Sequence, residues 1–360
     1  MKRRAVLRAL SGAPFLRGAL PFLTAFSAGA SVEASAASTI AAAFGHLPAP
    51  ESIRRVFAGG PPASTLIAVL APEKLMGWPW NVSAEARAWL PPAVRDLPQV
   101  GRLAGRGSTM SSEILLQLRP DLILDVGTVD ATYISSMRRV TEQTGLPCVL
   151  MHGGLADYPA QLREAGRMLG VAARGEQLAV WAETTLALAA RVRAAVPPGS
   201  RPRIYYARGA AGLETGLDGS INMETIECAG GRNVAAETGQ RGGIVKVSLE
   251  QVFAWNPAVI LTQDAEFARR VLVDPLWRPL EAVRTRRVYL APTRPFGWLD
   301  VPPSVNRLIG VRWLLARLYP EHPLVAAAPD LHTSATAFHR LFYGVEPGAD
   351  ALDALLEGPT

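Results

Sequence analysis

The chain has 360 residues, of which 49% are hydrophobic and only 19% are charged, a balance that excludes an intrinsically disordered protein. Its 37 basic residues outnumber 31 acidic ones, which gives a formal net charge of +6 and a pI of about 9.7. The two cysteines, Cys148 and Cys228, exclude a disulfide framework and a multi-cysteine metal site. The 32 glycines and 29 prolines follow no Gly-X-Y period, which favours many short elements joined by tight turns.

Residues 1–36 have the pattern of a secretory leader. Basic residues open the segment, an apolar stretch covers residues 19–30, and small-x-small cleavage motifs stand at 28–30 and 34–36. The apolar stretch is too short to cross a bilayer core about 30 Å thick as a helix. We therefore predict a signal peptide over residues 1–36, and the Arg3-Arg4 pair leaves the twin-arginine route open. The alternative, a buried amphipathic helix, is disfavoured because glycines and prolines interrupt the segment.

Beyond the leader, short strand patterns alternate with helical patterns. This alternation is typical of a parallel sheet with helical crossovers, so residues 37–156 are predicted to form an N-terminal α/β lobe. Its expected elements are strands at 55–57, 121–126 and 148–151 and helices at 63–70 and 131–144.

Residues 157–198 contain no strand pattern. A helical pattern extends to about residue 169, and an Ala/Leu/Glu/Arg-rich run over 174–196 predicts a helix about 34 Å long. Pro197-Pro198-Gly199 ends this helix. It is long enough to join two lobes, so we expect residues 157–198 to form a bridge.

A second alternation predicts a C-terminal α/β lobe over residues 199–324 and a helical tail over 325–360. The predicted fold class is α/β, with two Rossmann-like lobes of parallel sheet joined by a single long rigid helix and with a ligand cleft between the lobes. The expected strands are 203–206, 259–262 and 287–290, and the expected helices are 223–229, 306–318, 335–342 and 349–356.

A repeat links the two lobes. Ser111 and Glu113 open a helical pattern that leads to a proline and an apolar strand, and Ser248 and Glu250 open the same succession. A glutamate in the first helical turn is favoured by the helix dipole, so capping explains either residue alone. Two such glutamates at equivalent places in two lobes would also suit docking onto a symmetric partner, and both interpretations stay open.

The sequence carries no motif of a known catalytic class. It has no Gly-x-Ser-x-Gly, Walker or His-Glu-x-x-His pattern, and only His152 of the five histidines follows a predicted strand. We therefore predict a protein that is not an enzyme and that binds no metal directly. A secreted α/β hydrolase, with His152 and Asp264 as isolated candidates, is the weaker alternative. Because lysines are few and no basic patch is interleaved with aromatics, no nucleic-acid partner is expected.

Glycine, aromatic and arginine residues gather in the loops after the predicted strands, where open α/β sheets bind ligands. Arginine offers a planar fork to anionic oxygens, and aromatic faces stack on flat chelate rings. A solvated loop position remains the alternative for each arginine. The candidate ligand-binding residues are Trp78, Trp80, Arg102, Arg106, His152, Tyr206, Arg208, Arg241, Arg294, Phe296 and Trp298. The tryptophans expected in the core instead are Trp89, Trp181, Trp255, Trp277 and Trp313.

Four groups of residues resemble a known family. They are 111–113 with 120–123, 205–209 with 228–234, 247–252, and 295–298 with 306–308. Together they resemble the periplasmic binding proteins of iron-siderophore, haem and vitamin B12 ABC importers. The resemblance implies two α/β lobes that move little around a stiff bridging helix, with a ligand cleft between them. It also implies a glutamate on each lobe that pairs with arginines of the permease, and Glu113 and Glu250 stand at the matching positions.

We accordingly predict a monomeric periplasmic substrate-binding protein that captures an anionic metal chelate and delivers it to an ABC permease dimer. A ferric siderophore is the favoured ligand, with molybdate, tungstate, haem, cobalamin and a nickel complex as alternatives. No cofactor is expected, because any metal would arrive chelated within the ligand. Most of the net charge of +6 falls in the leader, so the remaining charges act through their placement. Cys148 and Cys228 fall in different lobes and are expected to be buried free thiols.

Overall fold

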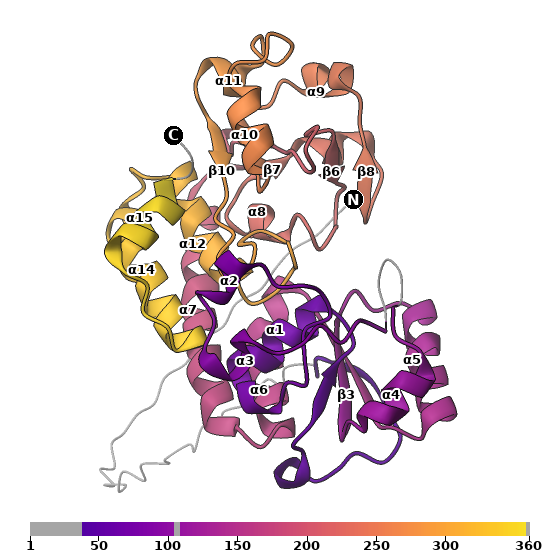
Figure 1. The fold of residues 1–360 in the computed structure, drawn as a ribbon. Coiled ribbons are helices and arrows are strands. Elements are labelled where there is room, and N and C mark those ends of the chain that lie inside the picture. Colours follow the sequence, from indigo (N-terminus) through magenta and orange to yellow (C-terminus); the bar gives the residue numbers. More distant parts are fainter. Residues whose placement is uncertain (1–37, 104–108, 358–360) are drawn as a thin grey trace, which may run out of the picture. The chain divides into compact units, whose positions relative to one another are not determined.

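The computed structural model describes residues 38–103 and 109–357. The elements of the N-terminal lobe are β1 (Ile40–Phe44), β2 (Val56–Ala58), α1 (Pro61–Leu70), α2 (Ala84–Arg87), α3 (Pro92–Arg95), α4 (Ser112–Leu118), β3 (Leu122–Gly127), α5 (Ala131–Thr144) and β4 (Cys148–His152). The four strands form one sheet of order β1-β4-β3-β2. Figure 1 shows this lobe in indigo to magenta, with β3 labelled and α4 and α5 beside it. The parallel pairing of β2, β3 and β4 agrees with the predicted fold class.

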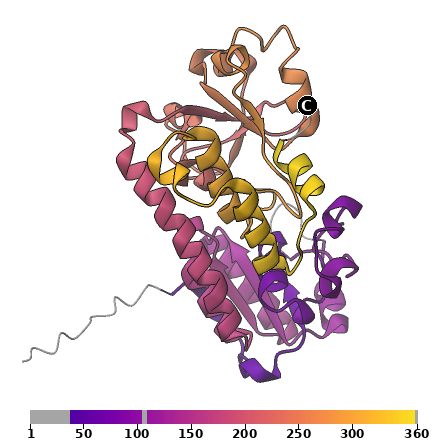
Figure 2. The same cartoon turned by 90° about the vertical axis from the view of Figure 1, so that its left-hand side faces the viewer.

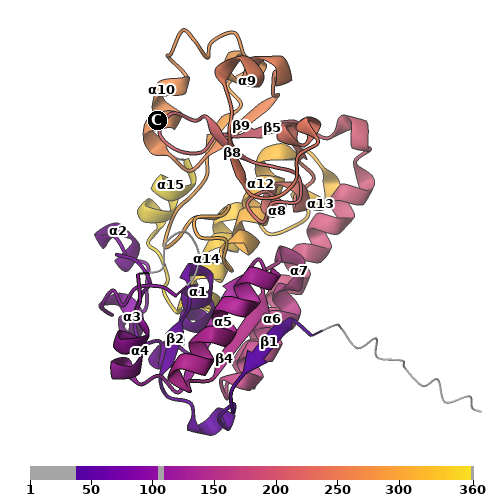
Figure 3. The same ribbon diagram turned by 90° about the vertical axis from the view of Figure 1, so that its right-hand side faces the viewer.

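Strand β1 differs from the prediction because it pairs antiparallel with β4 at the edge of the sheet (Figure 3). Its sequence, Ile-Ala-Ala-Ala-Phe, is dominated by alanine, which is depleted in strands, so the segment carried no strand pattern. The sheet of the N-terminal lobe is therefore mixed, with one antiparallel edge strand on a parallel core.

The C-terminal lobe contains β5 (Arg203–Tyr206), β6 (Glu214–Gly216), α8 (Glu224–Cys228), β7 (Arg232–Asn233), β8 (Ile244–Lys246), α9 (Leu249–Trp255), β9 (Val259–Thr262), α10 (Ala265–Val271), α11 (Glu281–Arg284) and β10 (Val288–Leu290). Its main sheet has the order β10-β9-β5-β7, and all of its strands are parallel. The lobe also contains a two-stranded antiparallel ribbon of β6 and β8, which the sequence did not predict.

Two packed helices connect the lobes, α6 (Tyr158–Met168) and the 24-residue α7 (Ala172–Ala195), and α7 extends from one lobe to the other (Figure 2). Glycines allow their close approach, since a Cβ at Gly175 would lie 2.5 Å from the Leu162 carbonyl oxygen. In the part of the chain that the structure describes, no helix, α7 included, is long and apolar enough to span a membrane.

The C-terminal segment packs onto both lobes. It comprises α12 (Arg307–Leu318), α13 (Pro323–Ala326), α14 (Leu331–Phe338), a π-helical turn η6 (His339–Tyr343) and α15 (Ala349–Glu357). Helix α12 contacts α7 and α8, whereas η6 contacts α1 of the N-terminal lobe. Arg174 of α7 also donates to the carbonyl oxygens of Leu341 and Phe342. The segment is thus integrated into the fold rather than appended to it.

Successive residues along a strand of either sheet belong to different hydrophobic cores, because side chains in a strand point alternately to the two faces of the sheet. In β3, Leu122 and Leu124 belong to a core shared by both lobes, whereas Ile123 belongs to a core of the N-terminal lobe alone. Tyr206 and Tyr205 of β5 divide in the same way between the shared core and a C-terminal one. The shared core includes residues of α7 and α12, so the described residues form one compact unit.

Arg307, the fully buried first residue of α12, ties the lobes together. Its Nη1 donates to Glu224 Oε2 of α8 at 2.6 Å. Its Nη2 donates to the carbonyl oxygen of Gly153, just after β4, at 2.5 Å and to the Tyr158 hydroxyl at 2.7 Å. Glu224 Oε2 also accepts from the backbone N–H of Leu155 at 2.8 Å. One guanidinium therefore joins groups from both lobes.

Candidate ligand-binding site

A cavity of about 380 Å³ is lined by both lobes. The N-terminal lobe contributes residues between 80 and 86, at the start of α2, and the C-terminal lobe contributes the residues after β5 and β9 and the loop after β10. The cavity thus lies at the carboxyl edge of a parallel sheet, where such sheets bind ligands. Its lining residues are Trp80, Asn81, Val82, Ser83, Ala86, Tyr206, Arg208, Gly209, Gln263, Asp264, Thr293, Arg294, Pro295, Phe296, Gly297 and Val301.

Aromatic rings form one side of the cavity. The rings of Trp80 and Phe296 line it with their centroids 5.3 Å apart. Trp78 lies outside the lining and is 1% exposed, with its ring 5.5 Å from Trp80 and 5.3 Å from Phe296. Its indole N–H donates to the Val94 carbonyl oxygen at 2.8 Å, which fixes the ring. Trp78 therefore supports the two rings that a ligand can stack on.

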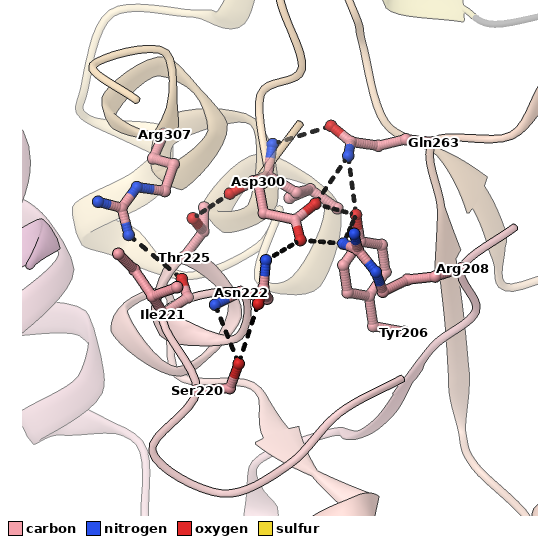
Figure 4. A network of polar contacts seen from close by, with 10 residues as sticks. Tyr206, Arg208, Ser220, Ile221, Asn222, Thr225, Gln263, Asp300 and Arg307 are labelled. Atoms are coloured by element: carbon pink, nitrogen blue, oxygen red, sulfur yellow. Dashed lines mark hydrogen bonds and ion pairs between the residues drawn. The ribbon is translucent and has the colours of Figure 1, made fainter. Parts of the chain in front are cut away.

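A polar network centres on Asp300 beneath the cavity (Figure 4). The Tyr206 hydroxyl donates to Asp300 Oδ1 at 2.5 Å, and Gln263 Nε2 donates to the same oxygen at 3.0 Å. Asn222 Nδ2 donates to Asp300 Oδ2 at 2.6 Å, and Arg208 Nη1 forms an ion pair with that oxygen. Burial raises the pKa of Tyr206, so its hydroxyl remains a proton donor.

The two arginines of the lining differ in their partners. Arg208 lies over the Tyr206 ring, 5.2 Å from its centroid, and its charge is paired with Asp300. Arg294 donates from Nη1 to Thr293 Oγ1 at 3.0 Å and takes part in none of the ion pairs found among the described residues. Its carbonyl oxygen accepts from Trp298 Nε1 at 3.0 Å, which anchors the loop.

The structure brings five of the predicted site residues together. Trp80, Tyr206, Arg208, Arg294 and Phe296 all line the cavity, although they come from three separate stretches of sequence. Their side chains combine stacking surfaces with cationic and phenolic donors, which suits an oxygen-rich ligand with an apolar portion.

The other candidates lie outside this lining. Trp298 is fully buried beneath the loop and supports Arg294, as Trp78 supports Trp80. His152 is exposed at the end of β4. Arg241 forms a surface ion pair with Asp218. Arg102 is half-buried away from the cavity, and Arg106 lies outside the described residues.

Sequence reasoning missed three polar members of the network. Gln263 directly follows β9, so its place after a strand was a usable signal. Asp300 and Asn222 stood in no recognised pattern, because their partners come from distant parts of the chain. A carboxylate near predicted cleft arginines gains meaning only once the fold places it within hydrogen-bond distance.

The remaining tryptophans and both cysteines have structural positions. Burial raises the pKa of the Cys148 and Cys228 thiols to about 11, and both cysteines are free, Cys148 being buried and Cys228 half-buried. The predicted core tryptophans are buried at Trp255, Trp277 and Trp313 and half-buried at Trp89 and Trp181.

Glu113 and Glu250 occupy equivalent positions in α4 and α9. In each helix the N-cap serine, Ser111 or Ser248, accepts a hydrogen bond from the backbone N–H three residues on, at 3.3 and 3.2 Å. Hydrogen bonds from Ser111 and from its own backbone N–H lower the pKa of Glu113, and its backbone N–H and Ser248 do the same for Glu250. Both side chains are therefore capped, ionised and exposed to solvent.

No group of three or more His, Cys, Asp or Glu residues that could hold a metal ion occurs in residues 38–103 and 109–357. The charged side chains of the lining are Arg208, Arg294 and Asp264, and Asp264 caps α10 by accepting from the backbone N–H of Phe267 at 2.8 Å. This set of donors suits the oxygen atoms of a ligand better than a bare cation.

Comparison with known proteins agrees with this geometry. The periplasmic binding protein family matches residues 81–295. The molybdate-binding protein MolA of Haemophilus influenzae is 34% identical over 145 residues, which cover 40% of this chain and 39% of MolA. A cobalamin-binding protein of Halobacterium salinarum is 28% identical over 195 residues, 51% of this chain and 49% of that protein. Each match thus spans less than half of the relative.

Similarity of the whole fold is more extensive. The structure of an ABC transporter solute-binding protein from Sulfurospirillum deleyianum superposes with a TM-score of 0.78 and 28% identity, covering 86% of this chain and 95% of that one. The chain belongs to the periplasmic binding protein family, as its sequence resemblance indicated. It is therefore a member of a family of binding proteins rather than of enzymes.

Proposed function

We propose that the protein captures an anionic metal chelate in the periplasm and delivers it to the permease of an ABC importer. The observation that supports this most is the cavity itself, which combines Trp80 and Phe296 with the guanidinium groups of Arg208 and Arg294. Aromatic faces stack on the flat rings of a chelator, and arginine forks bind its anionic oxygens. Its volume of about 380 Å³ lies within the range of small-molecule sites.

A ferric siderophore is our first candidate ligand. Its iron is already enclosed by the chelator's oxygen atoms, so the protein needs to recognise only the outside of the complex. The lining suits that task because its groups are stacking surfaces and hydrogen-bond donors rather than converging metal ligands. The metal in this proposal is part of the cargo, and no resident cofactor is required.

Molybdate or tungstate is the second candidate, and the relative that favours it is MolA, whose name states that it binds molybdate. Such an anion would be held by the same arginines through charge-assisted hydrogen bonds. It would leave the aromatic side of the cavity with little to stack on.

Calorimetry of the mature chain tests the proposal. The probes are a ferric catecholate, a ferric hydroxamate, haem, cobalamin, molybdate and tungstate, and the expected result is tight binding of a ferric chelate with quenching of tryptophan fluorescence. A Trp80→Phe variant should keep most of the affinity but lose most of the quenching, because Trp80 is the indole that lines the cavity. Tight binding of molybdate with no binding of ferric chelates would replace the first candidate by the second.

Native mass spectrometry of protein taken from its own periplasm complements the titrations. We expect the mass of the chain lacking residues 1–36, as a monomer, together with the mass of one chelate. Hydrolysis of a siderophore ester or amide by the pure protein would instead make it an enzyme.

A further inference from the structure

The carboxylate of Asp300 is ionised. The residue is only 2% exposed, and its side chain is wholly buried. Arg208 can only donate to it, and the Gln263 amide is oriented by the Leu299 N–H, which donates to Gln263 Oε1 at 3.2 Å. Gln263 Nε2 therefore faces Asp300 as a donor, as does Asn222 Nδ2. An oxygen pair surrounded by donors accepts these hydrogen bonds as an anion.

This buried anion cancels one of the two positive charges of the cavity. Arg208 contacts Asp300 directly, whereas Asp300 is absent from the lining and cannot be displaced by a ligand without breaking its bonds to Tyr206, Gln263 and Asn222 (Figure 4). With Asp264 also in the lining, the charges of Arg208, Arg294, Asp264 and Asp300 sum to zero. A ligand therefore meets directed donors without a net positive field.

We infer that Asp300 is a specificity-determining residue, which sets the net charge of the ligand that the cavity accepts. This inference rests on the proposed function and narrows it. Asp300 holds the Arg208 guanidinium in place and opposes every negative charge that enters. This electrostatic repulsion grows with the negative charge of the ligand, since the Coulomb energy is proportional to the ligand's charge. Asp300 thus favours a chelate whose metal offsets most of its oxygen charge over a small free dianion.

Perrhenate and tungstate form a matched pair of probes, because they are tetrahedral oxyanions of nearly equal size that carry one and two negative charges. Their affinities are measured by calorimetry at mildly alkaline pH for four proteins, wild type, Asp300→Asn, Arg208→Gln and the double variant. The ratio of tungstate to perrhenate affinity cancels most shape effects and reports the charge of the site.

We expect Asp300→Asn to raise this ratio about tenfold and Arg208→Gln to lower it about tenfold, because each removes one charge near the ligand. The double variant removes both charges and should return the ratio to within about threefold of wild type. A purely structural role of Asp300 would not produce this ordered series. If Asp300→Asn fails to fold, the comparison of Arg208→Gln with the double variant tests the same inference, because these two proteins differ only at position 300.

Equal ratios in all four proteins, or shifts of Asp300→Asn and Arg208→Gln in the same direction, would overturn the inference while leaving the proposed function intact. Failure of both wild type and Asp300→Asn to bind either oxyanion would also overturn it. The proposed function fails separately if the wild-type protein binds no ferric chelate and no oxyanion.

Discussion

Asp125 shows how the fold can alter the chemistry of one residue outside the cavity lining. It lies fully buried in β3, where Oδ2 accepts from the Tyr133 hydroxyl at 2.7 Å and Oδ1 from the N–H of Val126 at 2.9 Å. Burial raises the pKa of Asp125 from 3.8 to about 6, against the opposing effect of these hydrogen bonds. The carboxyl group of Asp125 therefore holds its proton more tightly in the folded protein than in the unfolded chain.

Between about pH 4 and pH 6 the folded state binds more protons at Asp125 than the unfolded state, so stability falls as pH rises through that window. The expected loss is about 3 kcal/mol, complete above pH 6. Urea unfolding of wild type and Asp125→Asn at several pH values measures it, and the difference between the two proteins isolates this group. Tyr133→Phe removes a bond that lowers the pKa, so it should extend the loss to higher pH. Parallel profiles for all three proteins would refute the assignment.

The sequence identified the residue types of the site better than the orientations of their side chains. Trp78 and Trp80 were both expected to bind ligand, yet Trp80 lines the cavity and Trp78 supports it. Two tryptophans separated by one residue in a loop carry no period from which the buried one can be chosen. Asp300 escaped prediction for a different reason, since its role depends entirely on side chains brought together by the tertiary fold.

Among the elements, α4 and α9 carry the internal repeat. Each has seven residues, begins at a serine N-cap and ends at a left-handed residue, Arg119 with φ 48° or Asn256 with φ 39°. A proline and then a parallel strand, β3 or β9, follow. The repeat was predictable because caps and prolines act locally. The edge strand β1 was not, because its pairing with β4 is a tertiary contact made by alanine-rich sequence.

If Glu113 and Glu250 dock the loaded protein onto its permease, reversing both to Lys should reduce uptake about tenfold while ligand affinity stays unchanged. Glu266→Lys is a matched control, because Glu266 is exposed in the first turn of the seven-residue α10 and lies outside the repeat. Transport of a radiolabelled ligand and calorimetry give the two readings. Unchanged uptake in the double variant would reduce both glutamates to helix caps.

For the whole molecule, the two lobes and the bridging helix followed from the alternation of strand and helix patterns. The packing of the C-terminal segment did not follow from it, since the contacts of this segment with α1, α7 and α8 join distant parts of the chain. The shared core and the Arg307 contacts make lobe movement costly, because a close-packed interior resists shear.

Replacing Arg307 by Ala should destabilise the protein by about 3 kcal/mol, because the fully buried guanidinium and its hydrogen bonds to Glu224, Gly153 and Tyr158 are all lost. Arg312→Ala is the control from the same helix. Arg312 is half-buried, and its Nε donates to Thr185 Oγ1 at 3.0 Å, so its loss should cost about 1 kcal/mol. Urea unfolding measures both. Equal costs for the two variants would show that Arg307 does not tie the lobes together.

The position of η6 has a consequence for how the protein is made. His339 is buried, with its Nε2 3.3 Å from the Arg294 carbonyl oxygen and its ring 4.9 Å from that of Trp89 in the N-terminal lobe. The cavity loop is therefore braced by residues synthesised some time after it. A nascent chain that ends before η6 lacks this brace, so the cavity loop can take its final position only after His339–Tyr343 have been translated. Completion of the site thereby depends on a segment that is separated from the loop by α12, α13 and α14 rather than on the loop itself.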